Sequence, residues 1–171
     1  MPFTTTPTQT PHLHRTLALA LEALEASDAP FGSVLTDSTN APPPRRPQPH
    51  THPRRPAANM DAAARASATV YTSGEHCAMC AAAHAWVGLG RIVYVASNQQ
   101  LSAWLREFEQ EKKEKEKEKE KEEEEGGVTF ELPVASLPIQ SVAPRVEVQG
   151  PVPELEAEIK ALHRRYAGLA P

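Results

Sequence analysis

The stretch TVYTSGEHCAMCAAAHAWVGLGRIVYVAS, residues 69–97, decides the fold. Two apolar runs rich in β-branched residues, 68–73 and 91–97, read as buried strands. Residues 77–89 between them are rich in alanine and end at glycines 88 and 90, which is typical of a helix. A further amphipathic helix is expected over 98–110. This order predicts a parallel crossover between the two strands and therefore an α/β sheet.

The flanking segments supply further elements of the same kind. Residues 12–27 predict a helix with one apolar stripe, and Phe31, Val34 and Leu35 predict a short strand after the Pro30–Gly32 turn. Residues 57–67 predict a short helix. The segment that begins near Pro153 predicts a final helix. Its apolar face would contain Leu155, Ile159, Leu162 and Tyr166, while Trp86 and Trp104 are expected in the core and His12, His14 and His163 at the surface.

Two segments have a composition that does not suit a folded core. Residues 41–56, APPPRRPQPHTHPRRP, contain seven of the seventeen prolines and four arginines, so no central strand or helix can run through them. The tract 109–125 contains ten Glu and six Lys, and its alternating charges make most i,i+4 pairs alike in sign. We therefore expect an irregular loop over 38–56 and a solvated insert over 109–127.

The chain length limits the number of domains, and the distribution of charge limits the kinds of binding partner. A chain of 171 residues suits one domain, here residues 12–108 with 128–168, preceded by a disordered tail over 1–11. The net charge of −4 comes from the Glu/Lys tract, and outside it 12 acidic residues balance 12 basic ones. This balance gives no support to binding of duplex nucleic acid or RNA.

The sequence also favours an intracellular location. The N-terminal residues 1–11 are rich in Thr and Pro and lack the apolar core of a signal peptide. No run approaches the roughly 18 apolar residues of a membrane span. Two closely spaced cysteines fit a reducing compartment, so we expect a cytoplasmic or nuclear protein with no membrane partner.

Cys77 and Cys80 are the residues that most clearly suggest chemistry. Three positions apart at the start of a helix, their sulfurs project to one side, where the helix dipole favours the thiolate form. Thiolate is the form that binds zinc. A single C-x-x-C also occurs as a redox pair or as two buried structural cysteines, so the spacing alone leaves these alternatives open.

The segment VYTSGEHCAMCAAAHAWVGLGRIVYVAS resembles the zinc-binding half of the cytidine and deoxycytidylate deaminase superfamily, whose usual turn is Glu-Pro-Cys-x-x-Cys. The upstream LALALEALEASDAPFGSVLTD resembles that family's first helix and its Pro-Phe-Gly strand. The likeness covers residues 12–37 and 68–108. It implies a three-layer α/β/α sandwich with a mixed sheet, a bound zinc ion, and hydrolytic deamination of a nucleobase, nucleoside or nucleotide.

The resemblance also implies an H-x-E motif before residue 69, in which His binds zinc and Glu moves protons. His52 is the expected third ligand, with His50 and His84 as competitors. No Glu occurs between Glu25 and Glu75, and Arg54 stands where the Glu would fall. Asn40 is a candidate for the family's substrate-contacting Asn, and Asp61 is the nearest carboxylate after His52.

Three accounts follow from this gap. The first is an active zinc-dependent deaminase of the guanine or tRNA adenosine deaminase branch, acting on a small cytosine-, guanine- or adenine-type substrate. The second is an inactive zinc-binding pseudoenzyme or interaction scaffold. The third takes residues 38–56 as a mistaken exon boundary. Members of this family often form oligomers through the face near the zinc-binding helix, so the resemblance implies a homodimer.

Overall fold

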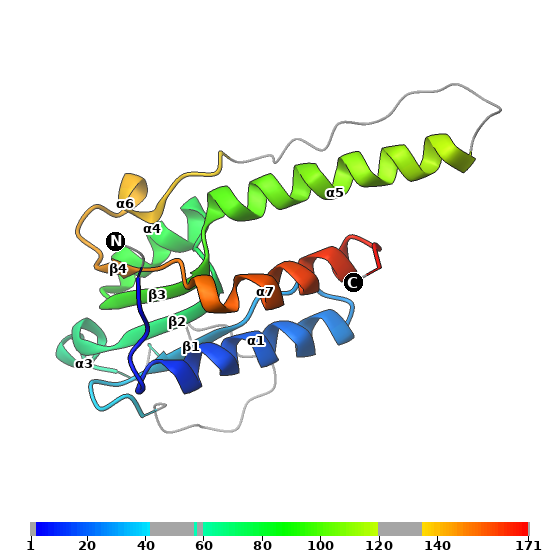
Figure 1. Ribbon diagram of the computed structural model, residues 1–171. Coiled ribbons are helices and arrows are strands. Elements are labelled where there is room, and N and C mark those ends of the chain that lie inside the picture. Colours follow the sequence, from blue (N-terminus) through cyan, green and yellow to red (C-terminus); the bar gives the residue numbers. More distant parts are fainter. Residues whose placement is uncertain (1–2, 42–56, 58–59, 120–134, 171) are drawn as a thin grey trace.

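Four strands form one mixed sheet in a computed structural model that describes residues 3–41, 57, 60–119 and 135–170 (Figure 1). In the order in which they pair, the strands are β1 (Ser33–Thr36), β2 (Thr69–Gly74), β3 (Arg91–Ala96) and β4 (Val148–Gln149). β1 is antiparallel to β2, whereas β3 is parallel to both β2 and β4. The predicted mixed α/β sheet is confirmed.

The crossover between β2 and β3 is helix α4 (Ala78–Val87). It ends at Gly88, whose φ of 73° is the left-handed conformation that closes helices. Gly90 is required by close packing, because a Cβ atom there would lie 2.4 Å from the carbonyl oxygen of Ala66 in α3 (Ala62–Ser67). The two glycines thus set the sharp return from α4 into the sheet.

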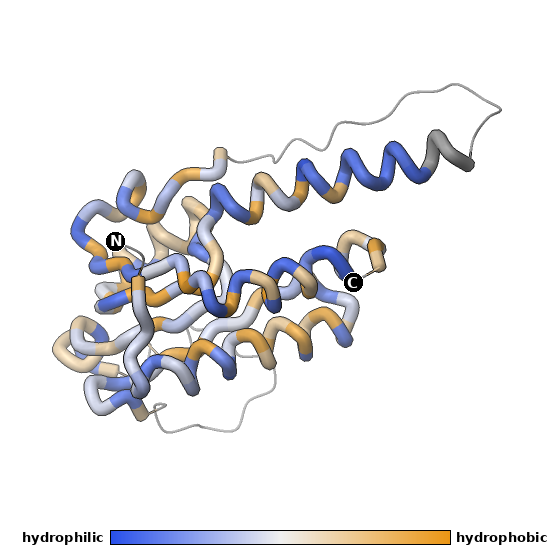
Figure 2. Tube along the Cα trace, in the orientation of Figure 1, coloured by the Kyte–Doolittle hydropathy of each residue, from blue (hydrophilic) through white to orange (hydrophobic). Residues whose placement is uncertain are grey.

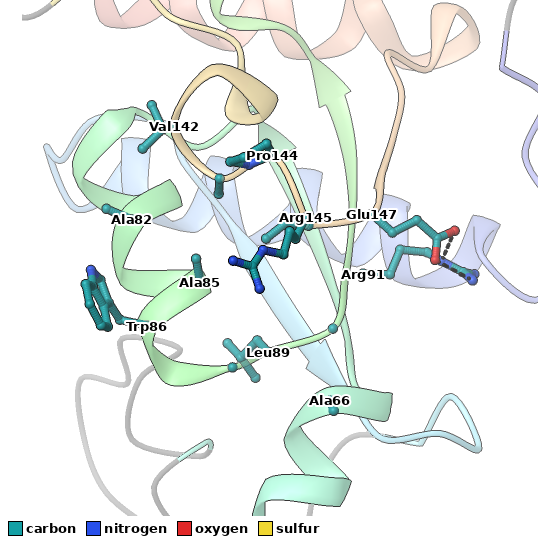
Figure 3. A pocket seen from close by; sticks show the side chains of 14 residues that line it. Ala66, Ala82, Ala85, Trp86, Leu89, Arg91, Val142, Pro144, Arg145 and Glu147 are labelled. Carbon is teal, nitrogen blue, oxygen red and sulfur yellow. Dashed lines mark hydrogen bonds and ion pairs between the residues drawn. The ribbon is translucent and has the colours of Figure 1, made fainter.

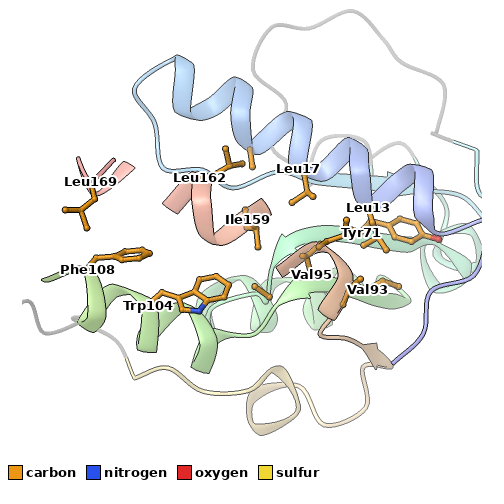
Figure 4. Packing of buried hydrophobic residues seen from close by; sticks show 14 residues of the cluster. Leu13, Leu17, Tyr71, Val93, Val95, Trp104, Phe108, Ile159, Leu162 and Leu169 are labelled. Atoms are coloured by element: carbon orange, nitrogen blue, oxygen red, sulfur yellow. The ribbon is translucent and has the colours of Figure 1, made fainter. Parts of the chain in front are cut away.

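Helices cover both faces of the sheet. Side chains alternate along each strand, so Val93 and Val95 of β3 face α1 (Thr10–Glu25) and α7 (Pro153–Tyr166), as Figure 4 shows. Ile92 and Tyr94 face the opposite side, where α4 and α6 (Ile139–Val142) pack. This arrangement is the three-layer α/β/α sandwich that the sequence predicted.

Helix α5 (Asn98–Lys119) is longer than expected, because it continues into the Glu/Lys tract. Trp104 and Phe108 anchor its first half in the core, and its hydrophilic second half extends past the sheet (Figures 1 and 2). The doubled lysine at 112–113 breaks the charge alternation. Within α5, only across this doublet do opposite charges fall at i,i+4, as in the Glu109–Lys113 and Glu111–Lys115 pairs at 3.0 and 2.7 Å.

Helix α7 adds a second anchor for α5. Arg164 donates to both carboxylate oxygens of Glu111, at 2.6 and 2.7 Å, and its guanidinium lies 5.8 Å from the centre of the Phe108 ring. Together with Lys115, Arg164 lowers the pKa of Glu111 to about 2. None of the described helices is both long enough and apolar enough to cross a membrane.

Three side chains lie where the sequence did not predict them. Trp86 was expected in the core, but it is 91% exposed on α4. Tyr166 was expected on the apolar face of α7, but it falls in the last turn and is half exposed. His163 was expected at the surface and is instead 4% exposed, with its ring packed against Phe31 and near Trp104. In each case the exposure of the side chain depends on which distant segments pack against its helix, and the local sequence does not specify these segments.

Burial of His163 makes stability depend on pH. Desolvation lowers the pKa of His163 from 6.5 to about 4, so between these values the unfolded chain binds a proton that the folded chain does not. Stability is therefore lost as the pH falls from 6.5 towards 4, by on the order of 3 kcal/mol. Urea unfolding of the wild type and His163→Gln at pH 7 and pH 4.5 measures this loss. We expect a smaller pH effect in the variant and no reduction in a His14→Gln control, and equal pH effects in wild type and His163→Gln would contradict the assignment.

Candidate metal centre

Cys77 and Cys80 lie directly beyond the carboxyl end of β2. Cys77 is the N-cap of α4, with an extended backbone (φ −63°, ψ 167°), and the helix itself begins one residue later than predicted. Cys80 lies in the first turn. Cys77 is exposed and Cys80 is partly buried, and neither forms a disulfide. Both thiols therefore flank one helix start at the carboxyl edge of a parallel strand pair, the usual place for binding sites in α/β sheets.

The chemistry of the two thiols fits one half of a zinc site. Two cysteine sulfurs three positions apart at a helix start are common zinc ligands. Within the described ranges, no three His, Cys, Asp or Glu side chains come together in a way that could hold a metal ion. His52, the predicted third ligand, and its competitor His50 lie outside the described residues.

His84 has a structural position in α4. Its Nε2 lies 2.8 Å from the carbonyl oxygen of Gly90, to which it donates, and the ring is 4% exposed. Desolvation lowers the pKa of His84, so the ring stays neutral near pH 7. Its ring meets that of His76 edge to face, with centroids 5.7 Å apart. His84 thus fixes the turn after α4, as expected for a histidine packed against the sheet.

Asn40 lies at the wrong edge of the sheet to contact a substrate near the thiols. β1 is antiparallel to β2, so Thr36 at its end pairs with Thr69 at the start of β2. Cys77 follows the far end of that strand, roughly 17 Å away at the usual rise per residue. Asn40 instead closes the turn after β1 and accepts a hydrogen bond from the Tyr71 hydroxyl at 3.1 Å. The structure thus places Asn40, a candidate substrate contact in the sequence, at the edge of the sheet away from the thiols.

Asp61 is also engaged elsewhere. Its carboxylate accepts the backbone N–H of Ala64 at 2.8 Å and caps α3. The six residues of α3 rise only about 9 Å, whereas β2 next to it in sequence spans about 17–20 Å. The N-terminus of α3 consequently falls short of the carboxyl edge, and Asp61 does not replace the missing Glu.

Glu75 stands at the Glu of the Glu-Pro-Cys turn in the sequence resemblance, which assigned it no role. It lies two residues before Cys77 and is 8% exposed. Its Oε2 accepts the backbone N–H of Asn98 at 2.9 Å, and its Oε1 accepts that of Ile139 at 2.8 Å. Because both partners are backbone groups distant in sequence, no pattern around Glu75 could have revealed them.

A separate groove of about 760 Å³ lies beside the C-terminal half of α4 (Figure 3). Trp86 lies at its rim, and Arg145 points into it. Arg91, which forms an ion pair with Glu147 at 2.8 Å, borders the groove and is the first residue of β3. The groove is thus at the amino end of the parallel strands, opposite the thiols, and is not part of the candidate metal centre.

Comparison with known proteins establishes the fold. No protein-family model and no curated protein sequence matches the chain. A solved guanine deaminase from Nitrosomonas europaea is 17% identical and has a TM-score of 0.50, with 97% of this chain and 87% of that chain covered. A protein in complex with 2,6-diaminopurine is also 17% identical, with a TM-score of 0.51 over 97% and 84% of the two chains. A structure from work on tRNA:A34 deaminases is 24% identical over 52% and 76%, with a TM-score of 0.37.

These neighbours define the architecture as the cytidine deaminase-like α/β fold. That fold is the one that the resemblance of residues 12–37 and 68–108 implied. At these identities the likeness concerns the fold, and the site must be argued from the chain's own residues.

The different exposure of the two thiols gives a direct test of the site's geometry. In chelator-treated protein, we expect iodoacetamide to modify exposed Cys77 faster than partly buried Cys80, as followed by peptide mass spectrometry. Cys77→Ser should leave only the slow reaction. Faster modification of Cys80 in the wild type would contradict the described start of α4.

Proposed function

We propose that this chain is a zinc-dependent hydrolytic deaminase acting on a nucleobase, nucleoside or nucleotide. The observation that carries the proposal is the placement of two cysteines outside any disulfide, Cys77 and Cys80, at the carboxyl edge of β2 within a deaminase-like fold. Cys77, Cys80 and His52 would hold the metal. Bound zinc would supply a water ligand with a pKa near 7, which is what hydrolysis near neutral pH requires.

The chain's own residues then set how fast such a reaction can run. Hydrolytic deamination needs a group that carries a proton to the leaving amine. Glu75 is close to Cys77 in sequence, but both of its oxygens already accept backbone hydrogen bonds. Arg54, where the family's Glu would fall, cannot accept a proton. These residues favour a slow enzyme, and they keep an inactive zinc-binding pseudoenzyme as the alternative.

Zinc content tests the proposed ligand set. Purified wild-type protein should contain about one zinc per chain. Cys77→Ser and His52→Ala should lose most of it, whereas the neighbouring His50→Ala should retain it. Metal analysis by mass spectrometry after desalting checks these values. Loss of zinc in His50→Ala with retention in His52→Ala would transfer the ligand role to His50, and a zinc-free wild type would overturn the proposal.

Arg54→Glu tests whether the motif has lost its proton carrier. If His52-Pro53-Arg54 stands in place of H-x-E, the substitution should raise ammonia release from a panel of cytosine, guanine and adenine compounds. The expected gain is on the order of 10²-fold or more, the usual contribution of general acid–base catalysis. Arg55→Glu is the matched control and should leave the rate unchanged. A zinc-loaded wild type and Arg54→Glu that both release no ammonia from any compound would favour the pseudoenzyme.

A further inference from the structure

Glu75 belongs to a compact hydrogen-bond network at the carboxyl edge of the sheet. Its backbone N–H donates to the carbonyl oxygen of Ala96 at 2.7 Å, which extends the β2–β3 pairing one step beyond Gly74. Its side chain then joins the start of α5, through the N–H of Asn98, to the start of α6, through the N–H of Ile139. The residue therefore holds three segments of the chain together.

Asn98 completes the network from the other side. Its side-chain amide donates to the carbonyl oxygens of His76 and Leu137, at 2.9 and 3.0 Å. The hydroxyls of Ser102 and Ser136 donate to the Asn98 carbonyl, at 2.8 and 2.9 Å. Glu75 thus binds the backbone of Asn98 and Ile139, and Asn98 binds the backbone of His76 and Leu137. We call this arrangement the Glu75–Asn98 clamp.

The clamp bears directly on the thiols because His76, whose carbonyl it fixes, is bonded to Cys77. Ile139, the other end of the clamp, is fully buried and belongs to the apolar cluster that contains Ala81 of α4. The first turn of α4 is thus held from its N-terminal side by Glu75 and Asn98 and from its buried side by α6.

We propose that Glu75 is a positioning residue that holds the Cys77–Cys80 turn in the geometry that binds metal. A carboxylate is required because it offers two acceptors and both are used, one for each backbone N–H. A glutamine would present an NH₂ group to one of these donors and leave it unsatisfied in a buried place. This inference depends on the proposed function for the metal alone, because the clamp itself is argued from the hydrogen bonds of Glu75 and Asn98.

The carboxylate of Glu75 is engaged by backbone N–H groups and not by any basic side chain that the structure describes. Among the described residues, no lysine or arginine forms an ion pair with it. Burial raises the pKa of nearby Tyr94 to about 12, and the Glu75 charge contributes to that shift. The carboxylate therefore serves to hold the backbone at this edge of the sheet.

The test uses Co²⁺, because cobalt–thiolate absorption reports directly on cysteine ligation. Titration of full-length Glu75→Gln should show Co²⁺ affinity weakened on the order of 10–100-fold, the usual effect of losing a residue that orients metal ligands. Glu75→Asp, which keeps two carboxylate oxygens on a shorter stem, should recover part of the affinity. The measurement is made at a temperature where circular dichroism shows every variant to be folded.

Asp37→Asn is the matched control. The Asp37 carboxylate also accepts two backbone N–H groups, from Thr39 at 2.7 Å and Ala41 at 3.1 Å, but it lies after β1 at the opposite edge of the sheet. It should bind Co²⁺ as tightly as the wild type. Wild-type affinity in Glu75→Gln, or an equal loss in Asp37→Asn, would overturn the positioning role.

A second readout separates this inference from the zinc proposal. Hydrogen exchange of the backbone amides at 98, 139 and 77–80 should accelerate in metal-free Glu75→Gln and stay unchanged in Asp37→Asn. If the wild type binds no Co²⁺ or zinc, the proposed function fails while faster exchange still supports the clamp. Unchanged exchange in Glu75→Gln would overturn the clamp whether or not metal binds.

Discussion

The parallel pairing of β2 with β3 is the constraint on which the rest of this structure depends. A parallel pair needs a crossover, and here the crossover is the ten-residue helix α4. The start of α4 must therefore lie at the carboxyl edge of the sheet and its end at the amino edge. This single requirement brings Cys77 and Cys80 to one edge and puts the groove beside Trp86 and Arg145 near the other.

The carboxyl edge is held together mainly by backbone groups. Glu75 and Asn98 reach the main chain of segments that are more than twenty residues away from each of them. The edge is consequently rigid before any ligand is considered, which is the condition for presenting two thiols in a fixed relation. Among the described residues at this edge, Glu75 has both carboxylate oxygens engaged by backbone N–H groups.

The sequence was sufficient to predict those elements whose signals are local. The apolar runs around residues 69–97, Gly88 at the end of α4, and the leucine stripe of α1 all predicted what the structure contains. The likeness to the deaminase superfamily predicted the fold, which the solved neighbours confirm. The zinc ligands Cys77, Cys80 and His52 remain predictions. The helix over residues 111–119 differs from the predicted insert, because the doubled lysine at 112–113 brings opposite charges to i,i+4 at the start of the tract.

The features that could not be predicted depend on contacts between distant segments. Burial of His163 is decided by Phe31 and Trp104, and the role of Glu75 by the amides of Asn98 and Ile139. Asn40 was one candidate substrate contact, and the antiparallel register of β1 places it at the edge away from the thiols. Strand direction thus fixes the place of Asn40 in the fold, which composition alone could not.

X-ray absorption at the zinc edge of the protein as purified, never exposed to chelators, tests the central claim most directly. The account predicts a zinc ion with two sulfur scatterers at about 2.3 Å and the remaining ligands nitrogen or oxygen. Protein without zinc, or zinc surrounded by nitrogen and oxygen alone, would contradict the claim that Cys77 and Cys80 form a metal centre.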